Sequence, residues 1–127
     1  MILTIALDPI LETRYHVKNL YPRVKNKAEL VEYNLSGKGI TTSKILRSLN
    51  VDVFSTGFLG GLKGNYIFNE LKKLKVYNDF IFTRDETKGN LVLIQDGEII
   101  STIVEEGPRI TREEIGSFYE LYNKIVD

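Results

Sequence analysis

Two kinds of hydrophobic pattern along the chain predict two kinds of β-strand. Residues 2–7 are almost continuously apolar and end at Asp8-Pro9, which is typical of a strand buried on both faces. Apolar and polar residues instead alternate in four other stretches, which indicates strands with one exposed face: 13–18, 29–34, 90–95 and 98–104. The dipeptide Asp96-Gly97 joins the last two stretches and predicts a tight hairpin.

Three stretches with helical spacing are interleaved with these strands. The first begins near Ile40, the second covers 63–75, and the third opens at Thr111-x-x-Glu114, which is a capping-box sequence. A strand at 51–58 and a short one near 79–83 flank the second helix. The apolar residues expected to face inward from the three helices are Ile40, Ile45, Leu46 and Leu49, then Ile67, Leu71 and Leu74, then Ile115, Phe118, Tyr122 and Ile125.

This order of elements predicts an α/β fold. Strands that alternate with helices indicate a parallel sheet flanked by helices, and the four half-polar strands indicate a second, antiparallel sheet interleaved with it. We expect residues 1–127 to form one composite domain. Its α/β body would comprise about 1–12, 36–86 and 105–127, and its second sheet about 13–35 and 87–104.

Composition and charge narrow the range of functions. Seventeen basic and seventeen acidic residues give a formal net charge of zero, which argues against a nucleic-acid partner or a polybasic membrane surface. The chain has no cysteine and one histidine, His16, so it offers no thiolate or histidine-based metal site. The apolar start lacks a basic lead and a cleavage site, and no apolar run is long enough for a membrane span, so we expect a soluble, cytoplasmic protein.

Glycine-rich turns before the first two helices are the main candidates for a binding site. Residues 35–41 (Leu-Ser-Gly-Lys-Gly-Ile-Thr) would bring free backbone amides and Lys38 to a helix start, where an anion binds well, although a simple strand-to-helix turn also needs glycine. Residues 57–64 contain a similar glycine cluster, but its spacing matches neither a Walker loop nor a dinucleotide fingerprint.

Charged residues elsewhere allow both functional and structural interpretations. Asp8 and Glu12 lie at the carboxyl end of the first strand, where parallel sheets bind ligands, but a solvated turn has the same composition. Taken alone, Lys25, Lys27 and Lys88 fit solvated charges. His16 on an alternating strand is best interpreted as a structural or surface histidine, because the sequence supplies no catalytic partner for it.

Taken in order, these motifs resemble the ribokinase-like (PfkB) carbohydrate kinases, in particular the 1-phosphofructokinase and tagatose-6-phosphate kinase branch. The opening 1–12 is similar to that branch's start, and Ser-Gly-Lys-Gly-Ile-Thr41 is similar to its Gly-Gly-Lys-Gly-Ile-Asn. Gly57-Phe-Leu-Gly-Gly61 also matches, and Thr87-Lys-Gly-Asn90 resembles its Thr-Arg-x-Asn. The resemblance implies a ribokinase-like sheet that is only partly present here, with the interleaved sheet acting as a lid over the sugar and as a subunit contact.

The resemblance also implies roles for individual residues. The residues implied to bind the sugar phosphate are Glu12, Lys25, Lys27, Gly37, Lys38, Thr41, Lys88 and Asn90. Four positions depart from the family pattern, with Glu12 for Asp, Ser36 for Gly, Thr41 for Asn and Lys88 for Arg. Family members are longer, and the part beyond this chain carries the Gly-Ala-Gly-Asp-like motif with the catalytic base and the ATP pocket. ATP and Mg are therefore implied for the whole family, and none is expected to bind this chain alone.

Three functions follow as hypotheses. The chain could be the acceptor-sugar and lid part of an ATP-dependent sugar-phosphate kinase, without catalytic residues of its own. It could instead be an inactive, truncated homologue that acts as a sugar-phosphate-binding or dimerisation module, or a structural domain without a ligand. We expect a homodimer through the alternating strands, unless one chain already buries Tyr15, Val31, Val92 and Ile103.

Overall fold

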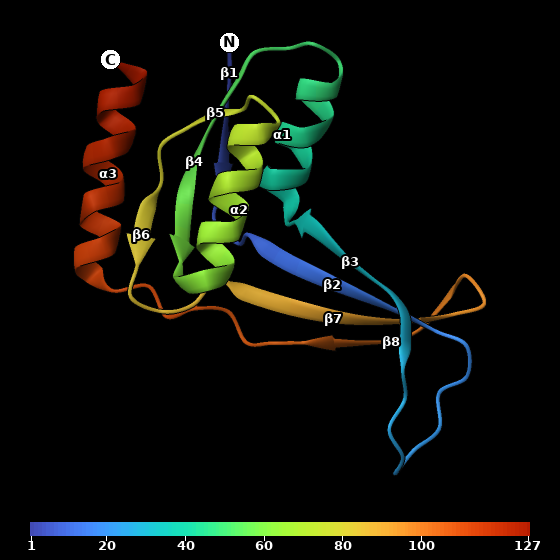
Figure 1. Cartoon of the computed structure of the whole chain (residues 1–127). Helices are drawn as coiled ribbons and strands as arrows, with labels where there is room; N and C mark the ends of the chain where they lie inside the picture. The colour runs from blue at the N-terminus through green and yellow to red at the C-terminus, as the bar shows by residue number, and fades with distance from the viewer.

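The structure is a computed structural model that describes all 127 residues, and it contains two β-sheets that lie at an angle to each other (Figure 1). The chain forms, in order, β1 (Ile2–Ala6), β2 (Ile10–Val17), β3 (Ala28–Ser36), α1 (Lys38–Ser48), β4 (Val53–Gly60), α2 (Gly61–Lys73), β5 (Tyr77–Asn78), β6 (Ile81–Thr83), β7 (Lys88–Gln95), β8 (Glu98–Val104) and α3 (Arg112–Val126). We call β1, β4, β5 and β6 the body sheet, and β2, β3, β7 and β8 the lid sheet.

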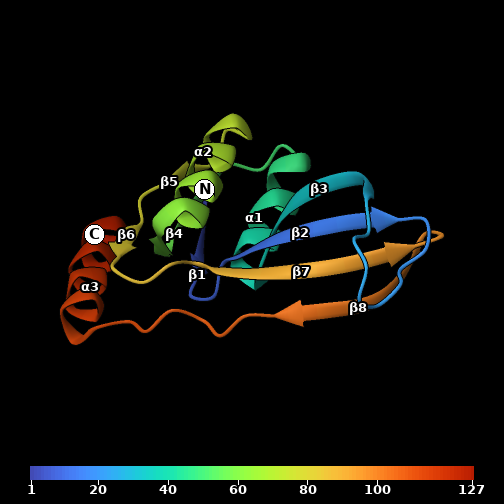
Figure 2. The same ribbon diagram turned by 60° about the horizontal axis from the view of Figure 1, so that its bottom comes forward.

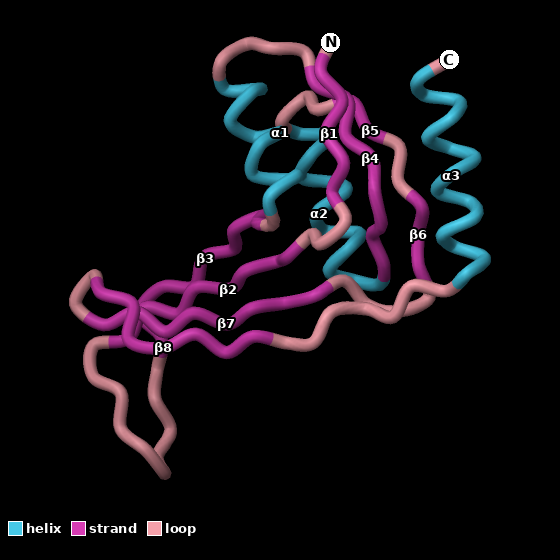
Figure 3. The backbone as a smooth tube through the Cα atoms, turned by 180° about the vertical axis from the view of Figure 1, so that it is seen from behind, coloured by secondary structure: helices cyan, strands magenta, loops and turns pink.

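The body sheet is parallel, as the sequence predicts. Its central strand β4 pairs with β1 on one side and with β5 and β6 on the other. Helices α1 and α2 lie next to each other on one side of the sheet, and α3 lies beside β6 (Figures 1 and 3). None of the three helices combines the length and the apolar character needed to cross a membrane.

The core lies between the body sheet and the helices α1 and α2. Ile40 of α1 and Ile67 and Leu71 of α2 are fully buried there, against Val53 and Leu59 of β4. Leu11 and Leu35, at the base of the lid sheet, belong to the same buried cluster. The lid is therefore anchored in the body core rather than attached by a loop alone.

The lid sheet has the strand order β3-β2-β7-β8, and here one expectation needs correction. The two outer pairs are antiparallel, but the central strands β2 and β7 are parallel, so the sheet is mixed and not antiparallel throughout. The reason is topological, because both central strands leave the body at the same edge and run outward (Figure 2). β3 and β8 return along them as hairpin partners. At the β7–β8 turn Asp96 and Gly97 have φ of 51° and 78°, which confirms the predicted tight hairpin.

Each helix begins within two residues of its predicted start, but some of the residues expected to face inward are exposed. Ile45, Leu49, Leu74 and Ile115 are all exposed. In α1 the side chain that packs inward beside Ile40 is Ser43, whose hydroxyl is 2.6 Å from that of Thr4 on β1. The inward face of α1 therefore includes a small polar residue that the hydrophobic pattern did not identify, and the hydrogen bond to Thr4 satisfies its buried hydroxyl.

Candidate functional site

A depression lies where the lid sheet, the body sheet and the start of α1 meet. Its volume is about 540 Å³, and it is lined by Ile10, Ser36, Gly37, Lys38, Thr41 and Thr42. An adjoining hollow of about 460 Å³ shares Ile10, Gly37 and Lys38 with it and extends to Asp8 at the end of β1. Three of the predicted binding residues, Gly37, Lys38 and Thr41, therefore line one surface at the carboxyl end of a parallel strand, which is where open α/β sheets bind ligands.

The first turn of α1 leaves its backbone amides free. The helix begins after Gly37 without a side-chain cap and without an acidic residue in its first turn. Gly37 has φ of 96°, and a Cβ at this position would lie 2.4 Å from the carbonyl oxygen of Asp8, so only glycine fits. The free amides, the positive end of the helix dipole and Lys38 together favour an anion in the depression.

The other two helix starts are already filled by carboxylates of the chain. Glu86 accepts hydrogen bonds from the N–H groups of Leu62 and Lys63 at the start of α2. Glu114 occupies the start of α3 as part of the predicted capping box with Thr111. The glycine cluster before α2 thus serves to place Glu86 and does not form a second open anion site.

Strand register brings one predicted residue of the lid, Lys88, close to the depression. Ile10 of β2 is paired with Ser36 of β3 and with Lys88 of β7, so Lys88 shares a sheet face with two residues that line the depression. Its ammonium group lies 3.7 Å from a carboxylate oxygen of Asp8. Lys88 therefore adds a partly buried positive charge at the edge of the anion site.

The next row of the lid carries groups suited to hydroxyls. Two residues further along the same face, Glu12 is paired with Asn34 on one side and with Asn90 on the other. Arg14 holds the Glu12 carboxylate at 2.5 Å, while the Asn90 Oδ1 atom is buried without a hydrogen-bond partner. A buried acceptor without a donor is costly, and a ligand hydroxyl is one group that could supply that donor.

Two predicted binding residues do not join this group within one chain. Lys25 and Lys27 lie in the exposed loop between β2 and β3, at the far end of the lid (Figure 1). The eight residues of β2 separate that loop from the depression by about 25 Å. The family resemblance implied that these lysines bind the substrate, but within one chain the extended β2–β3 hairpin holds them away from the depression.

Sequence reasoning missed three residues next to the predicted ones. Arg14 lies on the same face of β2 as Glu12, which the two-residue period of a strand could have indicated. Asn34 and Lys44 reach the row only through strand pairing and the packing of α1, for which the sequence carries no direct signal. The remaining candidate, His16, contacts Glu32 on the neighbouring strand at 2.5 Å, which supports its structural interpretation.

Several known structures share the overall fold of this chain. A phosphofructokinase-type protein from Staphylococcus aureus matches 95% of the chain at 26% identity, with a TM-score of 0.88. A possible 1-phosphofructokinase from Thermotoga maritima matches 96% at 29% identity and a TM-score of 0.82. The chain has the fold of the phosphofructokinase-type carbohydrate kinases. The resemblance found in the motifs is thereby confirmed, although no protein-family model matches the sequence.

The match covers only part of those kinases. The chain spans 39% of the Staphylococcus aureus protein and 40% of the Thermotoga maritima protein. The phosphofructokinase-2 of Escherichia coli in complex with fructose-6-phosphate has the same fold at 22% identity, with a TM-score of 0.86, and the chain spans 41% of it. The similarity therefore assigns a ribokinase-like fold to residues 1–127 and leaves the activity of a whole kinase to be argued separately.

Proposed function

We propose that residues 1–127 form the acceptor-sugar-binding and lid part of an ATP-dependent sugar-phosphate kinase of the phosphofructokinase type, acting in the cytoplasm. The observation that carries this proposal is the open start of α1, next to a lid face that presents Lys88, Glu12 and Asn90. The first provides for a phosphate and the second for sugar hydroxyls. The fold shared with phosphofructokinases supports the same assignment.

The two ends of the ligand would be held by different chemistry. Backbone amides after Gly37, with the ammonium groups of Lys38 and Lys88, would bind the phosphate, because a helix start and lysines both favour anions. Glu12 and Asn90 would bind sugar hydroxyls from the lid, and Thr41 from the body. Glu12 can accept two hydrogen bonds in addition to that of Arg14, and Asn90 has a free acceptor.

Catalysis is not assigned to these residues. Phosphoryl transfer needs a base at the accepting hydroxyl and groups that stabilise the transferring phosphoryl. The carboxylates nearest the depression, Asp8 and Glu12, are each paired with a cation, Lys88 and Arg14 respectively. No group of three or more carboxylate or histidine side chains is arranged to hold a metal ion. We therefore expect ATP and Mg to bind in the part of the related kinases that this chain does not span.

We also propose that two copies associate through the lid. Val31 and Ile103 are 40% and 57% exposed and lie on the same face of the lid sheet, and every residue of β8 is exposed. A sheet with an open edge and exposed apolar residues favours pairing with another copy. Burial of Tyr15, Val31, Val92 and Ile103 within one chain would argue against a dimer. Val92 is buried, but Val31 and Ile103 are exposed, so the dimer remains the expectation. Lys25 and Lys27 could then act only at the site of the second copy.

One alternative has support of its own. The departures Glu12, Ser36, Thr41 and Lys88 from the family pattern all lie in or beside the proposed sugar site. They favour a catalytically inactive homologue that acts as a sugar-phosphate-binding or dimerisation module. The kinase part and a sugar-phosphate-binding module need the same pocket, whereas a dimerisation module or a purely structural domain needs none.

Two measurements on the purified chain separate these functions. Isothermal titration with fructose 6-phosphate and fructose 1-phosphate should detect binding, and at a hundredfold excess over Kd the ligand should stabilise the fold by about 2.7 kcal/mol. Coupled ADP-release assays with the same sugars should show no turnover. The absence of any binding or thermal shift would contradict both the kinase part and the binding module, and would leave the dimerisation module or the structural domain. Turnover would contradict the assignment of catalysis to residues outside this chain.

A further inference from the structure

Lys44 of α1 lies directly behind the proposed sugar site and makes two hydrogen bonds there. Its Nζ atom donates to the side-chain Oδ1 of Asn34 at 3.0 Å and to the backbone carbonyl of Leu35 at 2.8 Å. Lys44 comes one helical turn after Thr41, so the two residues lie on the same face of α1. The lysine therefore connects the helix that forms the anion site with the strand that carries the lid row.

The bond to Oδ1 determines how the Asn34 amide is oriented. An asparagine side chain carries one acceptor and one NH₂ donor group. Because Lys44 can only donate, it uses the acceptor and turns the Nδ2 donor group away from itself. The structure gives Nδ2 no hydrogen-bond partner in the protein, and it is not among the buried polar atoms without a partner, so it is accessible.

Asn34 stands beside Glu12 on the lid. The two residues are directly paired between β2 and β3, so their side chains share one face at a Cβ separation of about 5 Å. A donor at this position complements the carboxylate of Glu12 and the acceptor of Asn90 in the same row. A sugar hydroxyl both donates and accepts, so it can satisfy a carboxylate and an amide donor together.

The electrostatics around Lys44 fit this arrangement. Burial lowers the pKa of the Lys44 ammonium below its usual value, the nearby Glu12 carboxylate raises it, and Arg14 lowers it further. Lys44 thus lies within the charge field of the same row of residues. Lys44 is half-buried where α1 packs on β3, and both of its hydrogen bonds are to residues of β3, so it is more than a surface charge.

We propose that Asn34 is an additional sugar-hydroxyl-binding residue and that Lys44 is the positioning residue that orients its amide. This inference rests on the proposed function, because it concerns the same pocket. It goes further in assigning hydroxyl recognition to a donor on β3, in addition to Glu12 and Asn90. It also predicts that affinity for the sugar part of the ligand can be lost while affinity for the phosphate part is kept.

The test compares fructose 6-phosphate with inorganic phosphate by isothermal titration. Asn34→Asp keeps an acceptor for Lys44 but removes the donor, so Kd for fructose 6-phosphate should rise about tenfold while Kd for phosphate stays within about twofold. Lys44→Met should show the same selective loss of fructose 6-phosphate binding. Lys44→Arg should retain that binding, since arginine can also donate a hydrogen bond to Asn34. Lys73→Met, on the exposed face of α2, is the matched control and should bind both ligands as the wild type does.

Each other outcome overturns the inference in a distinguishable way. If the wild type does not bind fructose 6-phosphate more tightly than phosphate, the proposed function fails and this inference fails with it. If the wild type shows that preference and Asn34→Asp retains it, only the inference fails. If Lys44→Met weakens both ligands equally and lowers Tm, Lys44 is a structural tie between helix and lid and not a positioning residue.

Discussion

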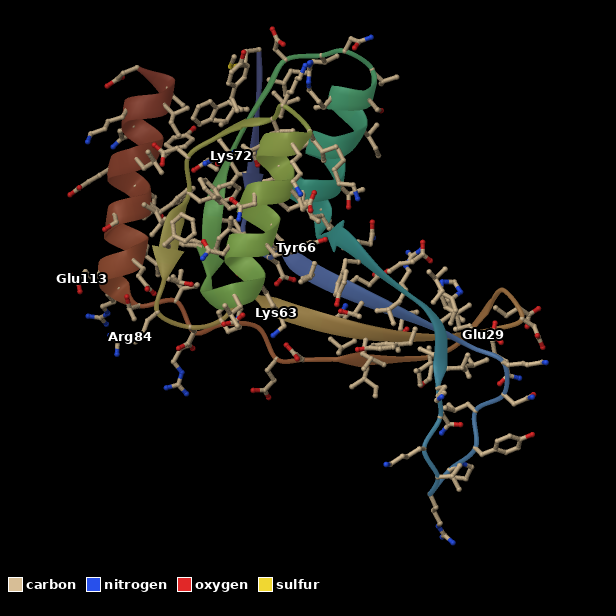
Figure 4. All side chains as sticks on the ribbon, in the orientation of Figure 1. Glu29, Lys63, Tyr66, Lys72, Arg84 and Glu113 are labelled. Carbon is tan, nitrogen blue, oxygen red and sulfur yellow. The ribbon has the colours of Figure 1, made fainter.

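The Glu86 carboxylate lies against the first turn of α2, where its Oε1 atom accepts a hydrogen bond from the N–H of Lys63 at 2.8 Å. Its second oxygen accepts one from Leu62 at 3.2 Å. Lys63 also points its ammonium group toward the base of the lid, between Glu86 and Glu105 (Figure 4). One helix start is thus satisfied from within the chain, while the start of α1 is left for a ligand.

Removing this internal anion should open a second site. In Glu86→Ala the amides of Leu62 and Lys63 lose their acceptor, so the fold should lose about 1 kcal/mol of stability, as in the loss of a helix cap. Inorganic phosphate at high concentration should then recover part of that stability by binding at α2. Urea unfolding of the wild type and the variant, each with and without phosphate, measures this. Equal stabilisation of both proteins by phosphate would contradict the role assigned to Glu86.

Gly37→Ala tests the open start of α1. The new Cβ would meet the Asp8 carbonyl at 2.4 Å in a left-handed conformation, so we expect sugar-phosphate binding to be lost. Gly116→Ala on α3 is the matched control, because its Cβ meets nothing within 4 Å and should stabilise the helix by about 0.5–1 kcal/mol. Lys38→Met keeps the backbone intact, so weaker phosphate binding by this variant distinguishes loss of the site from misfolding. Unchanged binding by both Gly37→Ala and Lys38→Met would place the ligand elsewhere.

Lys88→Arg should strengthen binding. An arginine can hold a phosphate through two parallel hydrogen bonds, whereas the lysine acts as a single charge that is already shared with Asp8. We expect Kd for fructose 6-phosphate to fall by about threefold to tenfold, and Lys88→Met to raise it by at least as much. Lys72→Arg serves as the control, because Lys72 lies in the last turn of α2, at the end of that helix away from the lid (Figure 4). Equal affinities for the three proteins in isothermal titration would show that residue 88 does not contact the phosphate.

The fold was largely predictable because it rests on local patterns. The continuous apolar run at 2–7, the alternating strands and the Asp96-Gly97 turn each correspond to an element of the structure. The direction of β7 beside β2 was not predictable in the same way. A two-residue period shows which residues share a face, but it does not name the neighbouring strand or its direction.

The site was predictable only where its residues are close in the chain. Gly37, Lys38 and Thr41 lie on one turn of helix, so their convergence follows from local geometry. Asn34 and Lys44 meet through packing of α1 against β3 and carry no motif of their own. The exposed positions of Ile45 and Leu49 have a related cause, since a helical period identifies an apolar face without showing what covers it.

Association through the lid can be tested at one position. Ile103 on β8 is 57% exposed, so Ile103→Lys should prevent two copies from pairing by burying a charge at their contact. Leu49→Lys is the control, because Leu49 is also exposed but lies at the far end of α1 from the lid. Light scattering should give a dimer for the wild type and Leu49→Lys, and a monomer for Ile103→Lys. A monomeric wild type, or an Ile103→Lys dimer, would contradict association through this face.

The capping box of α3 should make stability depend on pH. The hydrogen bond from the backbone N–H of Thr111 lowers the pKa of Glu114 below 4.5, burial opposes this by raising it, and the hydrogen bond from the backbone N–H of Arg84 lowers it further. A carboxyl group whose pKa is lower in the folded than in the unfolded state stabilises the fold. This contribution is complete above the pKa of the unfolded state, and it is lost as the pH falls through the pKa of the folded state. Glu114→Gln should therefore be less stable than the wild type at pH 7, and the difference should shrink below about pH 4.5. Urea unfolding at pH 7, 5 and 3.5 measures it, with Glu113→Gln as the control on the exposed side of the same turn (Figure 4). A difference that stays constant over this range would show that the Glu114 charge does not contribute.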